Sequence, residues 1–176
     1  MRFMLVVTIC LLGALMASAQ ETYLSYMCDI VHPVEACPKE GKEDWVKLDD
    51  QYCIKAFFSQ PFLNFTAAEA TCVQYGGHLV SIHNIQQLVG VVCTMYRLTP
   101  DRVPYWIGLY LSFNYEDYLV YDWTDGTTAD FLQWSYGQPN YFNNNQNCVE
   151  ANLNEWGFWN DLNCNYERGY VCSVKI

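Results

Sequence analysis

The sequence has few charged residues and almost no concentration of positive charge. Asp, Glu, Lys and Arg make up 16% of its 176 residues, the formal net charge is −10, and no cluster of Lys or Arg occurs along the chain. Binding to nucleic acid or to an anionic membrane surface depends on basic residues gathered in a stripe or patch. The composition therefore argues against both kinds of partner, and we expect no nucleic acid to be bound.

Motifs that carry catalysis are also missing. The chain has three histidines, His32, His78 and His83, and contains neither Gly-x-Ser-x-Gly nor His-Glu-x-x-His. His78 and His83 fall in the predicted helix–strand scaffold, where a histidine that is hydrogen-bonded within the fold is the commoner case. The sequence therefore predicts a protein that is not an enzyme.

Long apolar runs are absent except at the N-terminus. Arg2 precedes an apolar segment over residues 3–16, and Ala17-Ser18-Ala19 has the small residues of a signal-peptide cleavage site. No later stretch approaches the roughly 18 consecutive apolar residues of a membrane span. We therefore predict a signal peptide over residues 1–19, a secreted, extracellular protein and no membrane span. The alternative is a signal anchor that is kept as a span.

Cysteine is abundant in this chain. Removal of residues 1–19 takes Cys10 away and leaves eight cysteines: Cys28, Cys37, Cys53, Cys72, Cys93, Cys148, Cys164 and Cys172. An even number of cysteines in an oxidising compartment indicates four disulfides. No Cys-x-x-Cys pair is present, which disfavours a zinc site. Eight cysteines allow about 105 pairings, so spacing alone leaves the connectivity open.

Two helices are predicted in the first half of the chain. Apolar residues at helical spacing mark residues 65–75 and residues 84–98, and Gly76-Gly77 ends the first helix. The sequon Asn64-Phe65-Thr66 precedes that helix and is a candidate for glycosylation at Asn64. Thr66 also fits the N-cap of the helix, and the two roles are compatible.

The second half of the chain predicts strands and a long loop. Residues 105–109 and 119–123 have the aromatic and β-branched composition of short strands, and residues 137–147 have the composition of a loop. Residues 20–36 show no clear periodicity and are predicted to form an N-terminal extension. Helices followed by strands and a long loop indicate one α+β domain.

Eight short motifs follow one another in a fixed order. They are Cys37-Pro38, Gly76-Gly77-His78-Leu79-Val80-Ser81-Ile82, Trp106-Ile107-Gly108-Leu109, Trp123-Thr124-Asp125-Gly126, Gln138-Pro139-Asn140, Asn147-Cys148-Val149-Glu150, Trp159-Asn160-Asp161 and Tyr170-Val171-Cys172. This set resembles the C-type lectin-like domain over residues 37–173. The resemblance implies a secreted, single-domain C-type lectin with two helices, two small antiparallel sheets and a long loop that carries the ligand site.

The same resemblance implies a set of disulfides. The pairs that match the family are Cys37–Cys53, Cys72–Cys172 and Cys148–Cys164. Cys28 and Cys93 are left without a family partner. We expect them to bond to each other, as Cys28–Cys93, and a bond to another chain is the alternative.

The resemblance also implies a ligand site. Five residues match the positions at which lectins of the family hold a calcium ion that binds two sugar hydroxyls: Gln138, Asn140, Gln146, Asn160 and Asp161. Only Asp161 is a carboxylate, so we expect weak calcium binding, with a Kd of about 10⁻⁴ to 10⁻³ M. Gln138-Pro139-Asn140 lies between the motifs that imply galactose-type and mannose-type sugars. The alternative is that these residues only order a surface loop.

Aromatic residues accompany this loop. They are Tyr136, Tyr141, Phe142, Trp156 and Phe158, beside an asparagine-rich run. Flat aromatic faces next to amides suit the apolar face and the hydroxyls of a sugar. We expect Tyr141 or Phe142 to be exposed and Tyr141 to contact the sugar, whereas Trp156, Phe158 and Trp159 also fit a buried core.

The predicted function is thus a carbohydrate-binding lectin for galactose- or mannose-type glycans on cell surfaces or microbes. The alternative is a calcium-independent relative that acts in a mineral matrix or binds ice. After residue 19 the chain has eight threonines without a repeat, which disfavours ice binding, and it has no acidic runs of the kind expected in a mineral matrix. The sequence leaves the oligomeric state open.

Overall fold

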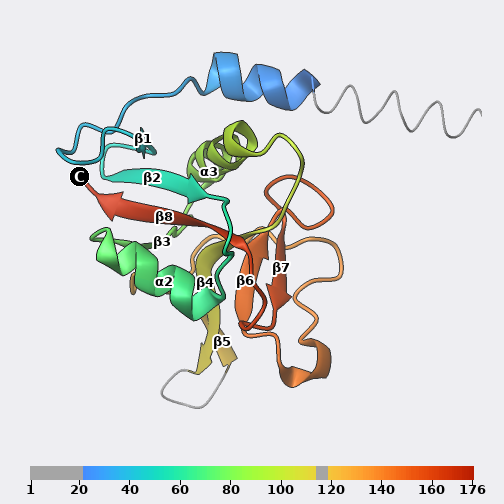
Figure 1. The fold of residues 1–176 in the computed structure, drawn as a ribbon. Helices are drawn as coiled ribbons and strands as arrows, with labels where there is room; N and C mark the ends of the chain where they lie inside the picture. The colour runs from blue at the N-terminus through green and yellow to red at the C-terminus, as the bar shows by residue number, and fades with distance from the viewer. Residues whose placement is uncertain (1–21, 114–118) are drawn as a thin grey trace, which may run out of the picture. The chain divides into compact units, whose positions relative to one another are not determined.

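The computed structural model describes residues 22–113 and 119–176 (Figure 1), so the predicted signal peptide over 1–19 lies outside the described residues. The chain divides into two units between Val34 and Glu35. In the first unit, residues 22–26 are α-helical and continue into the π-helical turn η1 (Met27–Val31), although the sequence there shows no clear periodicity. Within the described residues, no helix is long and apolar enough to span a membrane.

The second unit is built on a mixed sheet of eight described strands (Figure 1). The strands are β1 (Val46–Lys47), β2 (Tyr52–Phe57), β3 (His78–Leu79), β4 (Tyr105–Phe113), β5 (Leu119–Trp123), β6 (Cys148–Ala151), β7 (Trp159–Leu162) and β8 (Gly169–Lys175). Their order is β1-β2-β8-β4-β6-β7, with β3 paired to β8 and β5 paired to β4. The helical elements are α2 (Phe65–Gln74), α3 (Ile85–Leu98) and the 3₁₀ turn η2 (Phe142–Asn144). The α+β class is confirmed.

One feature of the sheet differs from the two antiparallel sheets that the sequence implies. Strands β4 and β8 pair in parallel, with Tyr105 opposite Gly169 and Trp106 opposite Tyr170, and this contact joins the two halves into one sheet. Gly169 has no room for a side chain in this pairing, because a Cβ there would lie 2.9 Å from Cε1 of Tyr105 in β4, 2.6 Å from Cδ2 of Phe58 and 2.9 Å from the carbonyl oxygen of Phe57. The pairing joins segments more than 60 residues apart, and no local pattern of the sequence indicates it.

Both helices begin at an asparagine. The Oδ1 atom of Asn64 accepts a hydrogen bond from the backbone N–H of Ala67 at 2.9 Å, and Asn84 caps α3 in the same way through Gln87. The prediction of Thr66 as the N-cap is therefore wrong, because Thr66 lies within the first turn of α2. An asparagine side chain is among the most favourable N-caps, which explains the earlier start. Glycosylation of Asn64 stays a prediction.

Three disulfides hold the second unit together. They are Cys37–Cys53, Cys72–Cys172 and Cys148–Cys164, with sequence separations of 16, 100 and 16 residues, as the family resemblance implied. Closing the longest interval stabilises the fold by about 4.7 kcal/mol on the chain-entropy estimate. Cys28 and Cys93 are each disulfide-bonded, and their pairing with each other stays a prediction.

A hydrogen-bonded cluster fastens the chain where it leaves β5 toward the long loop. Asp125 accepts hydrogen bonds from the hydroxyls of Ser81 at 2.6 Å and of Thr127 at 2.5 Å. The Thr127 hydroxyl also lies 3.1 Å from Nε2 of His83, whose Nδ1 lies 2.8 Å from Asp130. His83 is therefore a hydrogen-bonded scaffold residue, as the sequence predicts.

His78, in β3, is also a hydrogen-bonded scaffold residue. Its Nδ1 lies 2.6 Å from Oε1 of Glu69, and the second carboxylate oxygen of Glu69 accepts the backbone N–H of Leu79 at 2.8 Å. Glu69 belongs to α2 and Leu79 to β3, so these two bonds fix the helix against the sheet.

The Asp125 cluster gives a prediction for the pH dependence of stability. Burial would raise the pKa of Asp125, but the hydrogen bonds from Ser81 and Thr127 outweigh burial and hold the pKa below its ordinary value. A carboxyl with a lowered folded-state pKa stabilises the fold above its unfolded pKa of about 3.9, and this stabilisation is lost as the pH falls through the folded-state pKa. Asp125→Asn is therefore expected to lower the free energy of unfolding by roughly 1–2 kcal/mol at about pH 6 and by much less at about pH 3.

Urea unfolding at the two pH values, followed by tryptophan fluorescence, measures this difference. The exposed Asp101 offers a matched control, and Asp101→Asn is expected to change stability little at either pH. An effect of Asp125→Asn that is equal at both pH values would contradict the prediction.

Candidate functional site

Asp161, in β7, anchors the long loop. Its side chain is fully buried, and its two carboxylate oxygens accept hydrogen bonds from successive backbone N–H groups: Oδ1 from Asn140 at 3.0 Å and Oδ2 from Tyr141 at 2.7 Å. The carboxylate that the sequence predicts as a calcium ligand thus holds the backbone of the loop against the sheet.

The next backbone N–H of the loop is held from within the loop itself. The N–H of Phe142 is shared between Oδ1 of Asn140 at 3.0 Å and Oε1 of Gln146 at 2.7 Å. Tyr141 has a φ of 50°, and Asn143 and Asn144 have φ values of 56° and 51°. Asparagine visits this left-handed region readily, whereas tyrosine rarely does. The hydrogen bonds therefore impose a backbone that Tyr141 would not adopt by itself.

Two of the five predicted ligands lie apart from this network. Asn160 is buried in β7, and its Nδ2 donates to Oε1 of Glu150 at 2.9 Å, while Arg168 donates from Nε to the other oxygen of Glu150 at 2.6 Å. The side chain of Asn160 therefore belongs to an ion-paired cluster in the sheet. Gln138 stands by itself, with a buried Oε1 that has no hydrogen-bond partner in the part of the chain described.

The side-chain oxygens of the five predicted ligands do not fit a calcium ion. Calcium takes six to eight oxygens, and its affinity depends on how many of them are charged. The single carboxylate already accepts two N–H groups, and the amide oxygens of Asn140 and Gln146 both accept from Phe142. Across residues 22–113 and 119–176, no three His, Cys, Asp or Glu side chains gather as a metal site. The weak calcium binding stays a prediction.

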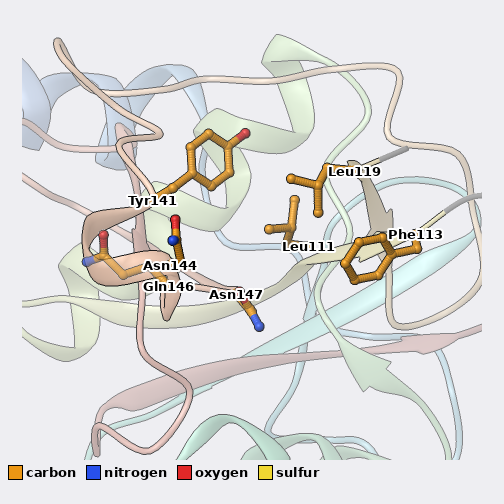
Figure 2. A pocket seen from close by; sticks show the side chains of 7 residues that line it. All are labelled: Leu111, Phe113, Leu119, Tyr141, Asn144, Gln146 and Asn147. Atoms are coloured by element: carbon orange, nitrogen blue, oxygen red, sulfur yellow. The ribbon is translucent and has the colours of Figure 1, made fainter. Parts of the chain in front are cut away.

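A cavity of about 420 Å³ lies beside the loop (Figure 2). The seven residues that line it are Leu111, Phe113, Leu119, Tyr141, Asn144, Gln146 and Asn147. In Figure 2, Tyr141, Asn144 and Gln146 come from the loop on one side, and Phe113 and Leu119 come from the facing ends of β4 and β5. None of the seven side chains is charged, so the cavity suits a neutral ligand with both an apolar face and hydrogen-bonding groups.

The exposure of the aromatic residues agrees in part with the sequence prediction. Tyr141 is 37% exposed and Phe142 is 67% exposed, whereas Trp159 is fully buried in the core. The prediction missed the apolar wall of the cavity, although Phe113 and Leu119 are 67% and 54% exposed. The sequence feature that could have indicated this wall is the pair of large apolar residues, Phe113 and Leu119, at the adjoining ends of two strands.

Tyr121 lies beneath the loop. Burial raises the pKa of its hydroxyl, and the neighbouring Tyr141 and Asp161 raise it further. The hydroxyl therefore stays protonated and adds no negative charge beside the carboxylate of Asp161.

Comparison with known proteins places this arrangement in a family. The Lectin C-type domain profile matches residues 62–174, which is more than half of the chain. The chain belongs to the C-type lectin family. A galactose-binding isoform of C-type lectin from Pseudechis porphyriacus is 33% identical over 145 residues, which cover 79% of this chain and 84% of that protein.

Two solved structures extend the comparison to the fold of this C-type lectin. The C-type lectin CEL-I from Cucumaria echinata superimposes with a TM-score of 0.66 at 27% identity, covering 79% of this chain and 97% of that one. A calcium-independent type II antifreeze protein superimposes with a TM-score of 0.60 at 26% identity, covering 80% and 96%. The resemblance drawn from the sequence motifs is confirmed, and membership of the C-type lectin family bears out the prediction that the protein is not an enzyme.

The ion pair of Glu150 and Arg168 is expected to contribute strongly to stability. The side chain of Glu150 is only 5% exposed, and Arg168 is its charged partner. Removal of one partner of a buried pair leaves an uncompensated charge, which typically lowers stability by about 3–5 kcal/mol. Arg168→Met is therefore expected to lower the free energy of unfolding in urea by roughly 3 kcal/mol. Arg102→Met, at an exposed arginine, serves as the control, and equal stability of the two variants would contradict the prediction.

Proposed function

We propose that this C-type lectin is a secreted protein that binds glycans with terminal galactose-type sugars, and that the sugar occupies the cavity between the loop and the ends of β4 and β5. The observation that carries the proposal is the composition of that cavity. An aromatic ring and three amides face apolar side chains, and none of the described residues that line the space is charged. This combination matches the chemistry of a neutral sugar.

Each wall has a distinct part in binding. The ring of Tyr141 and the side chains of Leu111 and Leu119 offer contact to the apolar face of a sugar ring. The amides of Asn144, Gln146 and Asn147 offer donors and acceptors to its hydroxyls. The carbonyl of Gln146 already accepts from Phe142, so its NH₂ group remains to donate.

The preference for galactose over mannose has two supports. One is the similarity to the galactose-binding isoform from Pseudechis porphyriacus. The other is stereochemical, because the axial O4 of galactose leaves the hydrogens on C3, C4 and C5 together on one face, and such a face packs well on an aromatic ring. A single sugar held by stacking and neutral hydrogen bonds is expected to bind weakly, with a Kd of about 1 mM.

Action outside the cell is supported by the disulfides. Three bonds within the second unit, and disulfide bonding of Cys28 and Cys93 as well, fit an oxidising compartment. Glycans on cell surfaces or microbes are therefore the proposed partners. Roles in a mineral matrix or at ice surfaces remain the competing functions.

A glycan array tests the proposal directly. The protein is expected to retain galactose-terminated glycans and to be released by free galactose. Asn147→Ala removes an exposed amide from the cavity but keeps the backbone carbonyl that accepts from Leu111 at 2.8 Å. This variant is expected to bind roughly five- to tenfold more weakly, because one hydrogen bond is lost. Asn165→Ala removes an exposed amide outside the cavity and is expected to bind like the native protein.

Three results would overturn parts of this proposal. Retention of mannose-terminated glycans alone would replace the sugar class. Glycan binding that Asn147→Ala leaves unchanged would place the sugar elsewhere on the protein. Adsorption to mineral or ice surfaces without retention of any glycan would favour a competing function.

A further inference from the structure

We infer that the long loop is held in shape by its own hydrogen bonds to Asp161, in the place where a calcium ion would otherwise be needed. Asp161 is then a positioning residue for Tyr141 and not a metal ligand. The shape of the loop follows from these contacts alone, whereas the importance of that shape for glycan binding rests on the proposed function.

Three successive backbone N–H groups of the loop point to side-chain oxygens of Asp161, Asn140 and Gln146. Those of Asn140 and Tyr141 point to the buried carboxylate of Asp161, and that of Phe142 points to the amide oxygens of Asn140 and Gln146. Hydrogen bonds to a carboxylate are roughly twice as strong as those between neutral groups. The loop is thus tied to β7 at consecutive residues.

The charges around these oxygens favour the backbone over a cation. An N–H group presents the positive end of its dipole to the oxygen that accepts it. A carboxylate has about four lone-pair sites and an amide oxygen has two, so each of these oxygens keeps a free lone pair. A cation at Asp161 would nevertheless share the one negative charge of the set with two N–H dipoles, and its other ligands would be neutral amide oxygens that also accept a hydrogen bond. Calcium affinity depends on the charge of the ligands, so this set favours the backbone over an ion.

Asn160 is held away from the loop by its own hydrogen bond. Its Nδ2 donates to Glu150, whose other oxygen is paired with Arg168. Rotation of Asn160 toward an ion would remove a hydrogen bond from a carboxylate that is almost fully buried. The cluster of Glu150 and Arg168 therefore keeps a fourth predicted ligand turned into the sheet.

The network also determines where the ring of Tyr141 lies. Tyr141 donates its N–H to Asp161 at 2.7 Å and has a φ of 50°, and in this conformation its side chain lines the cavity. Loss of that bond would let Tyr141 return to ordinary backbone angles and would move the ring. Asp161 therefore acts on the cavity through Tyr141.

Thermal unfolding of the full secreted protein tests the inference without any glycan. The unfolding midpoint is expected to be the same in 10 mM calcium chloride, in 10 mM magnesium chloride and in excess EDTA. A calcium ion bound with a Kd of about 10⁻³ M would raise the midpoint by roughly 3–6 °C under the first condition. A rise that is specific to calcium would overturn the inference.

Asp161→Asn provides the second test, because it keeps the size of the side chain but replaces one acceptor with an NH₂ group. The midpoint is expected to fall by roughly 5–10 °C, equally with calcium and with EDTA. Chymotrypsin is expected to cleave after Tyr141 or Phe142 at least tenfold faster than in the native protein. Asp101→Asn, at an exposed carboxylate, is the matched control and is expected to leave both readouts unchanged.

Gln146→Ala covers the case in which Asp161→Asn does not fold. It removes one of the two acceptors of the Phe142 N–H, so faster cleavage of the loop with an unfolding midpoint still insensitive to calcium supports the inference. Cleavage at the native rate would overturn it. If the unfolding midpoint does not change with calcium and the protein binds no glycan, the result contradicts the proposed function but not this inference.

Discussion

Strands β4 and β8 run in parallel at the centre of the sheet, and each half of the domain is attached to one of them. β8 pairs with β2 and β3, and the disulfide Cys72–Cys172 ties it to α2. β4 pairs with β5 and β6, and β7 follows β6. Because β5 forms one wall of the cavity and β7 anchors the loop, the geometry of the site depends on this one contact between strands. Gly169 lies in this contact, and a side chain there would meet Phe57, Phe58 and Tyr105.

The elements that local patterns specify could be predicted from the sequence. The helices at residues 65–74 and 85–98 follow from apolar spacing, and Gly76-Gly77 marks the end of the first helix; β5 occupies the predicted residues. Strands β2, β6 and β8 were not predicted. They are largely buried, so they lack the alternation of polar and apolar residues that marks a half-exposed strand. Their pairing depends on residues far away in the sequence.

The predicted site residues and the cavity share the long loop, but the contacts of those residues differ from the ones that the sequence implied. The motif resemblance led to the loop and to Asp161, and the aromatic residues led to an exposed Tyr141. The hydrogen bonds of the loop backbone to Asp161 depend on the conformation of the whole loop, and no motif encodes that conformation. The apolar wall was missed for a related reason, because Phe113 and Leu119 meet the loop only after β4 and β5 have paired.

The net charge of the chain has a consequence for ligands at a distance. The chain has nineteen acidic residues against nine basic ones, and Arg168 is already paired with Glu150. For the glycan binding that we propose, this excess of negative charge leaves the approach of a neutral oligosaccharide unopposed and repels a sialylated or sulfated chain, most strongly at low ionic strength. On that proposal, long-range repulsion favours neutral over anionic glycans before any side chain touches them.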